Sequence, residues 1–258
     1  MPSAYLDHAA STPLRPEARA ALDDALELVG NPSGHHAWAR AARRRLDDAR
    51  DQVAAVLGVA PASVTFTSGG TEADNLAVAG VVGARGGTPV CSAVEHHAVL
   101  APVLAAGGMT VAVDEAGAVR VDELANALRD RPEVSLVSVM TANNELGTVQ
   151  PLDAVAEVVA AVRPGRPHGL VLHTDAVAAA AWLDLAAQCR AADLVSISGH
   201  KVGGPKGIGV LVAPPELAIT PLLRGGGQER ERRDPGYRPQ ALARLAAALE
   251  AAAERGAA

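Results

Sequence analysis

Short apolar runs alternate along the chain with longer segments in which apolar residues recur at helical spacing. A short apolar run bounded by turn residues is typical of a buried strand, and the longer spacing is typical of a helix. The short runs predict strands over 63–68, 88–94, 109–114, 133–142, 169–176, 192–198 and 207–214. The longer segments predict helices over 71–84, 95–106, 121–130 and 152–162, with one more helix in the tail at 238–258.

This alternation predicts an α/β fold. The apolar runs lack a clean alternation with polar residues, as expected for strands that are covered on both faces. Strands that are separated by helices are joined by right-handed crossovers, which makes the sheet mostly parallel. We therefore expect a three-layer α/β/α domain with helices on both faces of the sheet.

The composition excludes several classes of protein. The 258 residues are 49% hydrophobic and 20% charged, with a formal net charge of −6, so neither disorder nor nucleic-acid binding is expected. No apolar stretch is long enough to cross a membrane and no signal peptide is visible, so a cytoplasmic protein is expected. The two cysteines, Cys91 and Cys189, lack metal-site spacing, and no bound metal is expected.

Polar residues gather where the predicted strands end. In parallel sheets the carboxyl ends of the strands meet at one edge, and ligands bind in the crevice beyond that edge. Five strand ends therefore supply one candidate site. Its members are residues 67–71, Glu95 and His96, residues 143–145, Asp175, and residues 198–201.

Three of these groups carry distinct chemistry. Gly69 and Gly70 stand between a strand and a helix, where backbone N–H groups can face a phosphate, although a tight turn explains them equally well. Asp175 could bind a metal, act as a base, cap a helix or hold a protonated ring nitrogen. Lys201 could be a surface charge or, with a lowered pKa, a nucleophile that forms a Schiff base. Together the three match the needs of pyridoxal 5′-phosphate (PLP).

The glycines do not fit two other phosphate-binding motifs. A Walker loop requires GxxxxGK[ST], which the sequence lacks, and the glycines at 203, 204, 207 and 209 lead into a strand instead of opening the helix of a dinucleotide-binding fold.

Eight stretches between residue 5 and about residue 233 form a recognisable series. They are YLDHAASTP (5–13), GNPSGHH (30–36), FTSGGTEADNLAVAG (66–80), VEHHAVL (94–100), TANNELGTVQP (141–151), HTDA (173–176), SISGHKVGGPKGIGVL (196–211) and GGGQERERR (225–233). In these stretches, which occur in family order, the sequence resembles the cysteine desulfurases of the class V aminotransferase group, which are fold type I PLP enzymes.

The resemblance implies a role for each candidate residue. Lys201 corresponds to the Schiff-base lysine, and His96 to the imidazole that stacks on the pyridine ring and is a candidate for proton transfer. Asp175 corresponds to the partner of the ring nitrogen, and Asn144 to an amide near the ring hydroxyl and the substrate carboxylate. The phosphate ligands implied are Gly70, Thr71, Ser198 and His200.

The resemblance also implies a reaction, partners and an assembly. The reaction is PLP-dependent C–S cleavage of L-cysteine to alanine, with the sulfur passed to an acceptor protein, as in iron–sulfur cluster assembly. The implied assembly is a homodimer. The expected organisation is an N-terminal arm (1–30) that contributes to the site, a PLP-binding large domain (31–236), and a C-terminal helix (237–258) as remnant of the small domain.

The sequence departs from the family pattern at several points. The family's catalytic cysteine and substrate-binding arginine lie in a C-terminal segment, and no cysteine follows Lys201 here. Ala178 replaces the family glutamine that would bind the ring oxygen, and residues 233–236 (RDPG) lack the threonine that would reach a neighbouring subunit's phosphate. We therefore expect PLP binding with desulfuration impaired in this chain alone. Another class V reaction, or a non-catalytic PLP-binding scaffold, is the alternative.

Overall fold

The fold is built on one seven-stranded sheet. The computed structural model describes residues 4–223 together with 225, 229 and 232, so the predicted tail helix lies outside the described residues. The strand order is β1-β7-β6-β5-β4-β2-β3. The strands are β1 Val64–Thr67, β2 Thr88–Ser92, β3 Met109–Val111, β4 Val134–Ser138, β5 Val171–Asp175, β6 Leu194–Ser198 and β7 Gly209–Val212.

The sheet is mixed but mostly parallel, as predicted. Strand β7 runs antiparallel to both of its neighbours, β1 and β6, whereas the pairs β2–β3, β2–β4, β4–β5 and β5–β6 are parallel. The carboxyl ends of β2, β4, β5 and β6 therefore point to the same edge. The turn between β6 and β7 also lies at that edge, because β7 returns from it.

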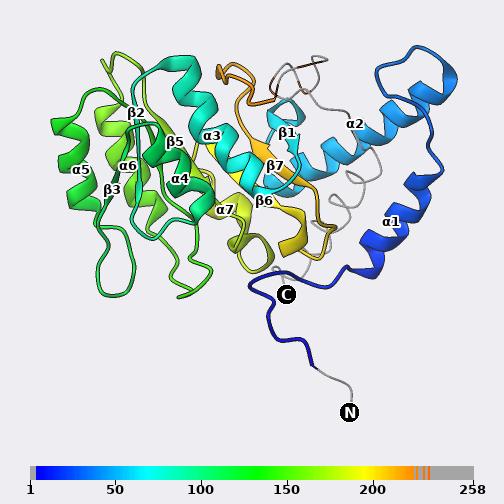
Figure 1. Ribbon diagram of the computed structural model, residues 1–258, viewed down its shortest axis with the longest axis horizontal. Helices are drawn as coiled ribbons and strands as arrows, with labels where there is room; N and C mark the ends of the chain where they lie inside the picture. The colour runs from blue at the N-terminus through cyan, green and yellow to red at the C-terminus, as the bar shows by residue number, and fades with distance from the viewer. Residues whose placement is uncertain (1–3, 224, 226–228, 230–231, 233–258) are drawn as a thin grey trace.

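Helices cover both faces of the sheet, which gives the predicted three layers (Figure 1). The helices α3 and α4 share one apolar cluster with the sheet, and α2, α5 and α6 pack in two clusters on the opposite face. The helices are α1 Pro16–Leu26, α2 Ala37–Leu57, α3 Gly70–Arg85, α4 His97–Ala105, α5 Val121–Asp130, α6 Leu152–Val162 and the short α7 Leu185–Gln188. Among the described residues, no helix is long and apolar enough to span a membrane.

Burial on two sides explains the unbroken apolar runs of the strands. In β4, Leu136 packs in the cluster beneath α3 and α4, whereas the next residue, Val137, packs beneath α5 and α6. In β7, Leu211 and Val210 divide between the two faces in the same way. Successive strand residues point to opposite faces, so both positions must be apolar.

One predicted helix begins later than expected. The apolar spacing predicts a helix over 95–106, but α4 begins at His97, and Glu95 lies in the preceding loop with only 7% of its surface exposed. Its carboxylate oxygen Oε1 accepts a hydrogen bond from the backbone N–H of Met140, at 2.6 Å. This long-range contact holds Glu95 out of the helix and fixes the loop that carries His96.

The N-terminal arm lies against the loop that contains Lys201. The Thr12 hydroxyl donates to the carbonyl of His200 at 2.8 Å and accepts from the N–H of Gly203 at 2.8 Å. The backbone N–H of Arg15 donates to the Gly203 carbonyl at 2.9 Å. Residues near the start of the chain are therefore held at the carboxyl edge of the sheet, close to β6.

Candidate active site

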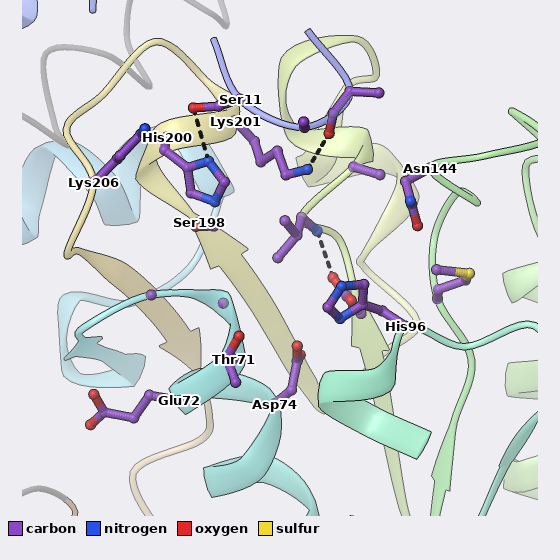
Figure 2. Close-up of a pocket in the computed structure, with 18 of the residues that line it drawn as sticks. Ser11, Thr71, Glu72, Asp74, His96, Asn144, Ser198, His200, Lys201 and Lys206 are labelled. Atoms are coloured by element: carbon purple, nitrogen blue, oxygen red, sulfur yellow. Dashed lines mark hydrogen bonds between the residues drawn. The ribbon is translucent and has the colours of Figure 1, made fainter. Parts of the chain in front are cut away.

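A cavity of about 1050 Å³ opens at the carboxyl edge of the sheet. The structure brings all eight predicted site residues to its wall, from five separate stretches of the chain (Figure 2). They are Gly70, Thr71, His96, Asn144, Asp175, Ser198, His200 and Lys201. The N-terminal arm adds Tyr5, Asp7, Ala9, Ala10 and Ser11 to the same wall.

The loop between β1 and α3 forms one end of the cavity. Helix α3 begins at Gly70, so the first N–H groups of the helix have no partner inside it and carry the positive end of the helix dipole. The carboxylate of Glu72 accepts from the N–H of Ser68 at 2.7 Å, which fixes the loop that leads into the helix. This geometry suits an anion, as the glycine pattern predicts.

Close packing explains the glycines of this loop. A Cβ on Gly70 would lie 2.8 Å from Cγ2 of Val177. A Cβ on Gly209, in β7, would lie 2.5 Å from the carbonyl carbon of Gly69 and 2.7 Å from the carbonyl oxygen of Ile197. Because the neighbours of Gly209 are backbone atoms, the loop at Gly69 can approach β7 this closely only where β7 has a glycine.

Replacing Gly209 by alanine should therefore destabilise the protein and loosen the loop at 68–70. We expect a loss of about 1–3 kcal/mol in the free energy of unfolding, as for other overpacked interiors. Gly83→Ala, in α3, is the matched control because its Cβ would meet only the Thr220 side chain, at 3.4 Å. Urea unfolding of both variants tests this, and equal stability of the two variants would contradict it.

Two basic side chains, His200 and Lys206, line the cavity near this loop (Figure 2). His200 is half-buried, and its Nδ1 lies 3.3 Å from the hydroxyl of Ser11. Burial lowers the pKa of His200, and the charges of Lys201 and Lys206 lower it further. His200 is therefore a neutral hydrogen-bonding group at neutral pH, while Lys206 supplies a cation at the cavity wall.

Lys201 also lines the cavity. It closes the short helical turn Gly199–Lys201 that follows β6, and its ammonium group donates a hydrogen bond to the carbonyl of Ala9 in the N-terminal arm. Burial lowers the pKa of Lys201, and the negative charges of Asp175 and Asp7 oppose that shift. A lowered pKa increases the fraction of free amine, which is the nucleophilic form.

Asp175 brings a carboxylate to the cavity wall. It is the last residue of β5, is 5% exposed, and its Oδ1 accepts from the N–H of Val177 at 2.8 Å. Burial raises the pKa of Asp175, whereas the Val177 N–H and the charges of His96 and Lys201 lower it. A buried carboxylate with one local donor is suited to pair with a cation that enters the cavity.

His96 does cap a helix, and it also faces the cavity. Its Nδ1 accepts from the N–H of Ala98 at 3.1 Å at the start of α4. This bond assigns the proton of the neutral ring to Nε2, the nitrogen that remains for the cavity. The same bond therefore caps helix α4 and fixes the tautomer and orientation of the ring.

The two neighbouring asparagines have different tasks. The side-chain oxygen of Asn143 accepts from the N–H groups of Glu145 and Leu146, both at 2.9 Å, and its amide donates to the carbonyl of Val94. Asn143 thereby fixes the loop that presents Asn144 to the cavity (Figure 2).

The site also contains residues that the sequence reasoning did not select. Asp74, in the second turn of α3, lines the cavity although it is only 1% exposed, and Lys206 lines it from the glycine-rich turn. A charged residue on the buried face of a helix is a sequence signal that could have identified Asp74.

Both cysteines are poor nucleophiles where they stand. Cys91 is buried within β2, and burial raises the pKa of its thiol to about 12. Burial also raises the pKa of the Cys189 thiol, to about 11. Neither belongs to the described residues that line the cavity. This agrees with the interpretation of both as packing residues.

The chain belongs to the class-V aminotransferase family. The sequence profile of that family, Aminotransferase class-V, matches residues 4–242. A "putative cysteine desulfurase IscS 1" of Bacillus subtilis is 42% identical over 238 residues, which cover 89% of this chain and 61% of the relative. The chain thus spans about 60% of the length of the curated relatives it matches.

Solved structures show the same fold. A "NifS-like protein" superposes with a TM-score of 0.90 at 31% identity, covering 97% of this chain and 69% of that one. The structure described as "SspA in complex with cysteine" superposes with a TM-score of 0.87, also at 31% identity, covering 96% of this chain and 72% of that one. These matches confirm the α/β architecture of a fold type I PLP-dependent domain.

Enzymes of this family depend on PLP, and the residues present fit that cofactor. The start of α3, His200 and Lys206 offer hydrogen-bond donors and a positive charge to a phosphate, and the carboxylate of Asp175 on the same cavity wall suits a ring nitrogen that can be protonated.

Proposed function

We propose that this chain is the cofactor-bearing part of a cysteine desulfurase. Its substrate is L-cysteine, and its reaction is C–S cleavage that leaves alanine and transfers the sulfur to a thiol. The observation that carries the proposal is the convergence of Lys201, Asp175 and the start of α3 on one cavity. The cysteine-bound SspA structure, which is similar over 96% of this chain, supports the choice of substrate.

PLP supplies an electron-poor ring that accepts the charge released when a bond to an amino acid breaks. The chain's own residues would hold it at three points. Gly70, Thr71, Ser198 and His200 would bind the phosphate, with the Lys206 charge nearby, and Asp175 would bind the ring nitrogen. The amine of Lys201 would hold the aldehyde carbon.

His96 and Lys201 would transfer protons during the reaction. The Ala98 N–H keeps a proton off Nδ1 of His96, so Nε2 carries the exchangeable proton at the cavity wall. The lowered pKa of Lys201 makes its amine able to take up a proton as well as release one. Asn144 would bind the substrate carboxylate near the middle of the cavity.

Sulfur transfer requires a thiolate, and the described thiols do not supply one. The pKa values of the Cys91 and Cys189 thiols, about 12 and about 11, leave both protonated at neutral pH. We therefore expect the reaction of these 258 residues to require an added thiol. In that reaction L-cysteine and RSH give alanine and RSSH, which balances atoms and charge.

Assembly and location are part of the same proposal. Large apolar side chains lie exposed around the site, including Leu146, Val149 and Trp182 at 67%, 48% and 71% exposure. Such surface supports a homodimer in which a second copy covers it. The described cysteines are free thiols, which supports a cytoplasmic location. We also propose that the sulfur passes to an acceptor protein and is used in iron–sulfur cluster assembly. This part of the proposal rests on the resemblance alone.

Alanine release tests the reaction. The PLP-loaded chain is incubated with L-cysteine, with and without an added dithiol, and alanine is quantified. We expect little alanine without the dithiol and a clear increase with it, and none for Lys201→Ala in either case. Alanine together with a persulfide on Cys91 or Cys189, without added thiol, would contradict the account of the thiols. No alanine under any condition would contradict desulfuration and favour another class V reaction or a scaffold.

A further inference from the structure

Three carboxyl groups are buried in or beside the wall of the cavity. Asp74, Glu95 and Asp175 are 1%, 7% and 5% exposed, and they come from α3, the loop after β2 and the end of β5. Their charges interact, because Asp175 acts electrostatically on both of the others. Three buried negative charges so close together would repel one another strongly in a poorly solvated site.

The surroundings of the three groups differ. Asp175 accepts from the Val177 N–H and lies within electrostatic reach of Lys201 and His96. Glu95 accepts from the Met140 N–H through Oε1, and Asp74 has one hydrogen bond with the side chain of Ser196. Among the described residues, the other oxygens, Oδ1 of Asp74 and Oε2 of Glu95, are buried without a hydrogen-bond partner. Figure 2 shows the Asp74 side chain pointing toward the cavity from α3, between Thr71 and His96. A buried carboxylate oxygen without a donor is costly, whereas a protonated oxygen is itself a donor.

The polar groups packed against Asp74 do not neutralise a charge on it. Nε2 of His173 lies 3.7 Å from Oδ1 of Asp74. His173 is fully buried, and burial lowers its pKa to about 3, so the ring is neutral at neutral pH. Its two nitrogens already lie within hydrogen-bond distance of the hydroxyls of Ser138 and Ser196, at 2.8 and 2.9 Å. The other titratable neighbours, Glu95 and Asp175, are acidic.

We propose that Asp74 and Glu95 are positioning residues that remain protonated beside the cofactor pocket, so that Asp175 alone carries the buried negative charge offered to a cationic ring nitrogen. This inference rests on the proposed PLP site for its purpose. The protonation of Asp74 and Glu95 is a property of the apoprotein, so it can be tested without PLP.

Burial and the charge of Asp175 raise the pKa of both Asp74 and Glu95, and the hydrogen bonds from Ser196 to Asp74 and from the Met140 N–H to Glu95 only partly oppose these shifts. A raised pKa means that the folded protein binds the proton more tightly than the unfolded chain. Each such group therefore lowers stability as pH rises above its ordinary pKa, which is about 3.9 for Asp and about 4.3 for Glu, until the raised pKa is reached. An amide in the same place has no proton to lose.

The test compares urea unfolding of the apoprotein for wild type, Asp74→Asn, Glu95→Gln and the exposed control Asp130→Asn. Between about pH 5 and pH 7, we expect Asp74→Asn and Glu95→Gln to gain stability over wild type as pH rises. The ratio of unfolding constants should change by up to about tenfold per pH unit for each group. Asp130→Asn should show no such trend. A pH-independent ratio, or a loss that grows with pH, would overturn the proposal.

Two further measurements complete the test. If a variant does not fold, infrared spectroscopy of the wild type at neutral pH tests the protonation directly. We expect a protonated-carboxyl band, and its absence would overturn the proposal. In PLP titrations at neutral pH, Asp74→Asn should bind within about twofold of wild type, while Asp175→Asn should lose about tenfold or more. Weakening of Asp74→Asn as severe as that of Asp175→Asn would also overturn it. Failure of wild type to bind PLP would reject the proposed function and leave the unfolding test intact.

Discussion

Replacing Lys201 by alanine is expected to abolish covalent retention of PLP. The amine of Lys201 is the candidate for attachment because it is half-buried, has a lowered pKa and lines the cavity within electrostatic reach of Asp175. Wild-type protein treated with PLP and then borohydride should keep a phosphopyridoxyl group through denaturation. Lys201→Ala should keep none at the same PLP concentration, and its visible absorption band should be that of unattached PLP.

Lys206→Ala is the matched control for this experiment. Lys206 lines the same cavity, so a nonspecific reaction of PLP with accessible lysines would label it as readily as Lys201. We expect Lys206→Ala to retain the covalent group while binding PLP more weakly, because it loses only a charge near the phosphate. Equal labelling of wild type and Lys201→Ala would contradict the role assigned to Lys201.

Replacing Glu229 by alanine should produce the largest loss of stability. Its carboxylate accepts from Arg50, at 2.6 Å, and from the backbone N–H of Phe66, at 2.8 Å. The side chains of Arg50 and Glu229 are 13% and 2% exposed, so removal of Glu229 leaves a nearly buried guanidinium and a buried N–H without their partner. Loss of one member of a buried pair costs about 3–5 kcal/mol. Phe66 lies in β1 just before the loop that we propose to bind the phosphate, so PLP affinity should fall as well.

The exposed pair Arg43–Asp47 provides the control. These side chains are 58% and 47% exposed, and Asp47→Ala should cost no more than about 1 kcal/mol. The free energies of unfolding of both variants are measured in urea. A loss for Glu229→Ala that is no larger than that for Asp47→Ala would show that the buried pair contributes little.

The sequence predicts most of the fold because its strands are buried on both faces. Runs such as 169–176 and 192–198 have few polar interruptions, and β5 and β6 lie within them. The start of α4 was misplaced because Glu95 follows helical spacing, yet it bonds to Met140, which lies 45 positions further along the chain. Local pattern carries no signal for a contact of that range.

The candidate site was predictable to a similar degree. Residues at strand ends, such as Asp175 and Ser198, converge because the sheet is mostly parallel, and their types carry recognisable chemistry. Asp74 was not selected because it lies on the buried side of a helix, where periodicity predicts a core residue. The contact of Glu229 with Arg50 was equally hidden, because it joins segments 179 positions apart.

The central claim is that this cavity is a PLP site with Lys201 as its attachment point. Peptide mass spectrometry of the wild-type protein, after PLP loading and borohydride reduction, tests that claim most directly. The account predicts one phosphopyridoxyl group per chain, located on the peptide that contains Lys201. The absence of the label, or a label on Lys206 instead, would contradict the account.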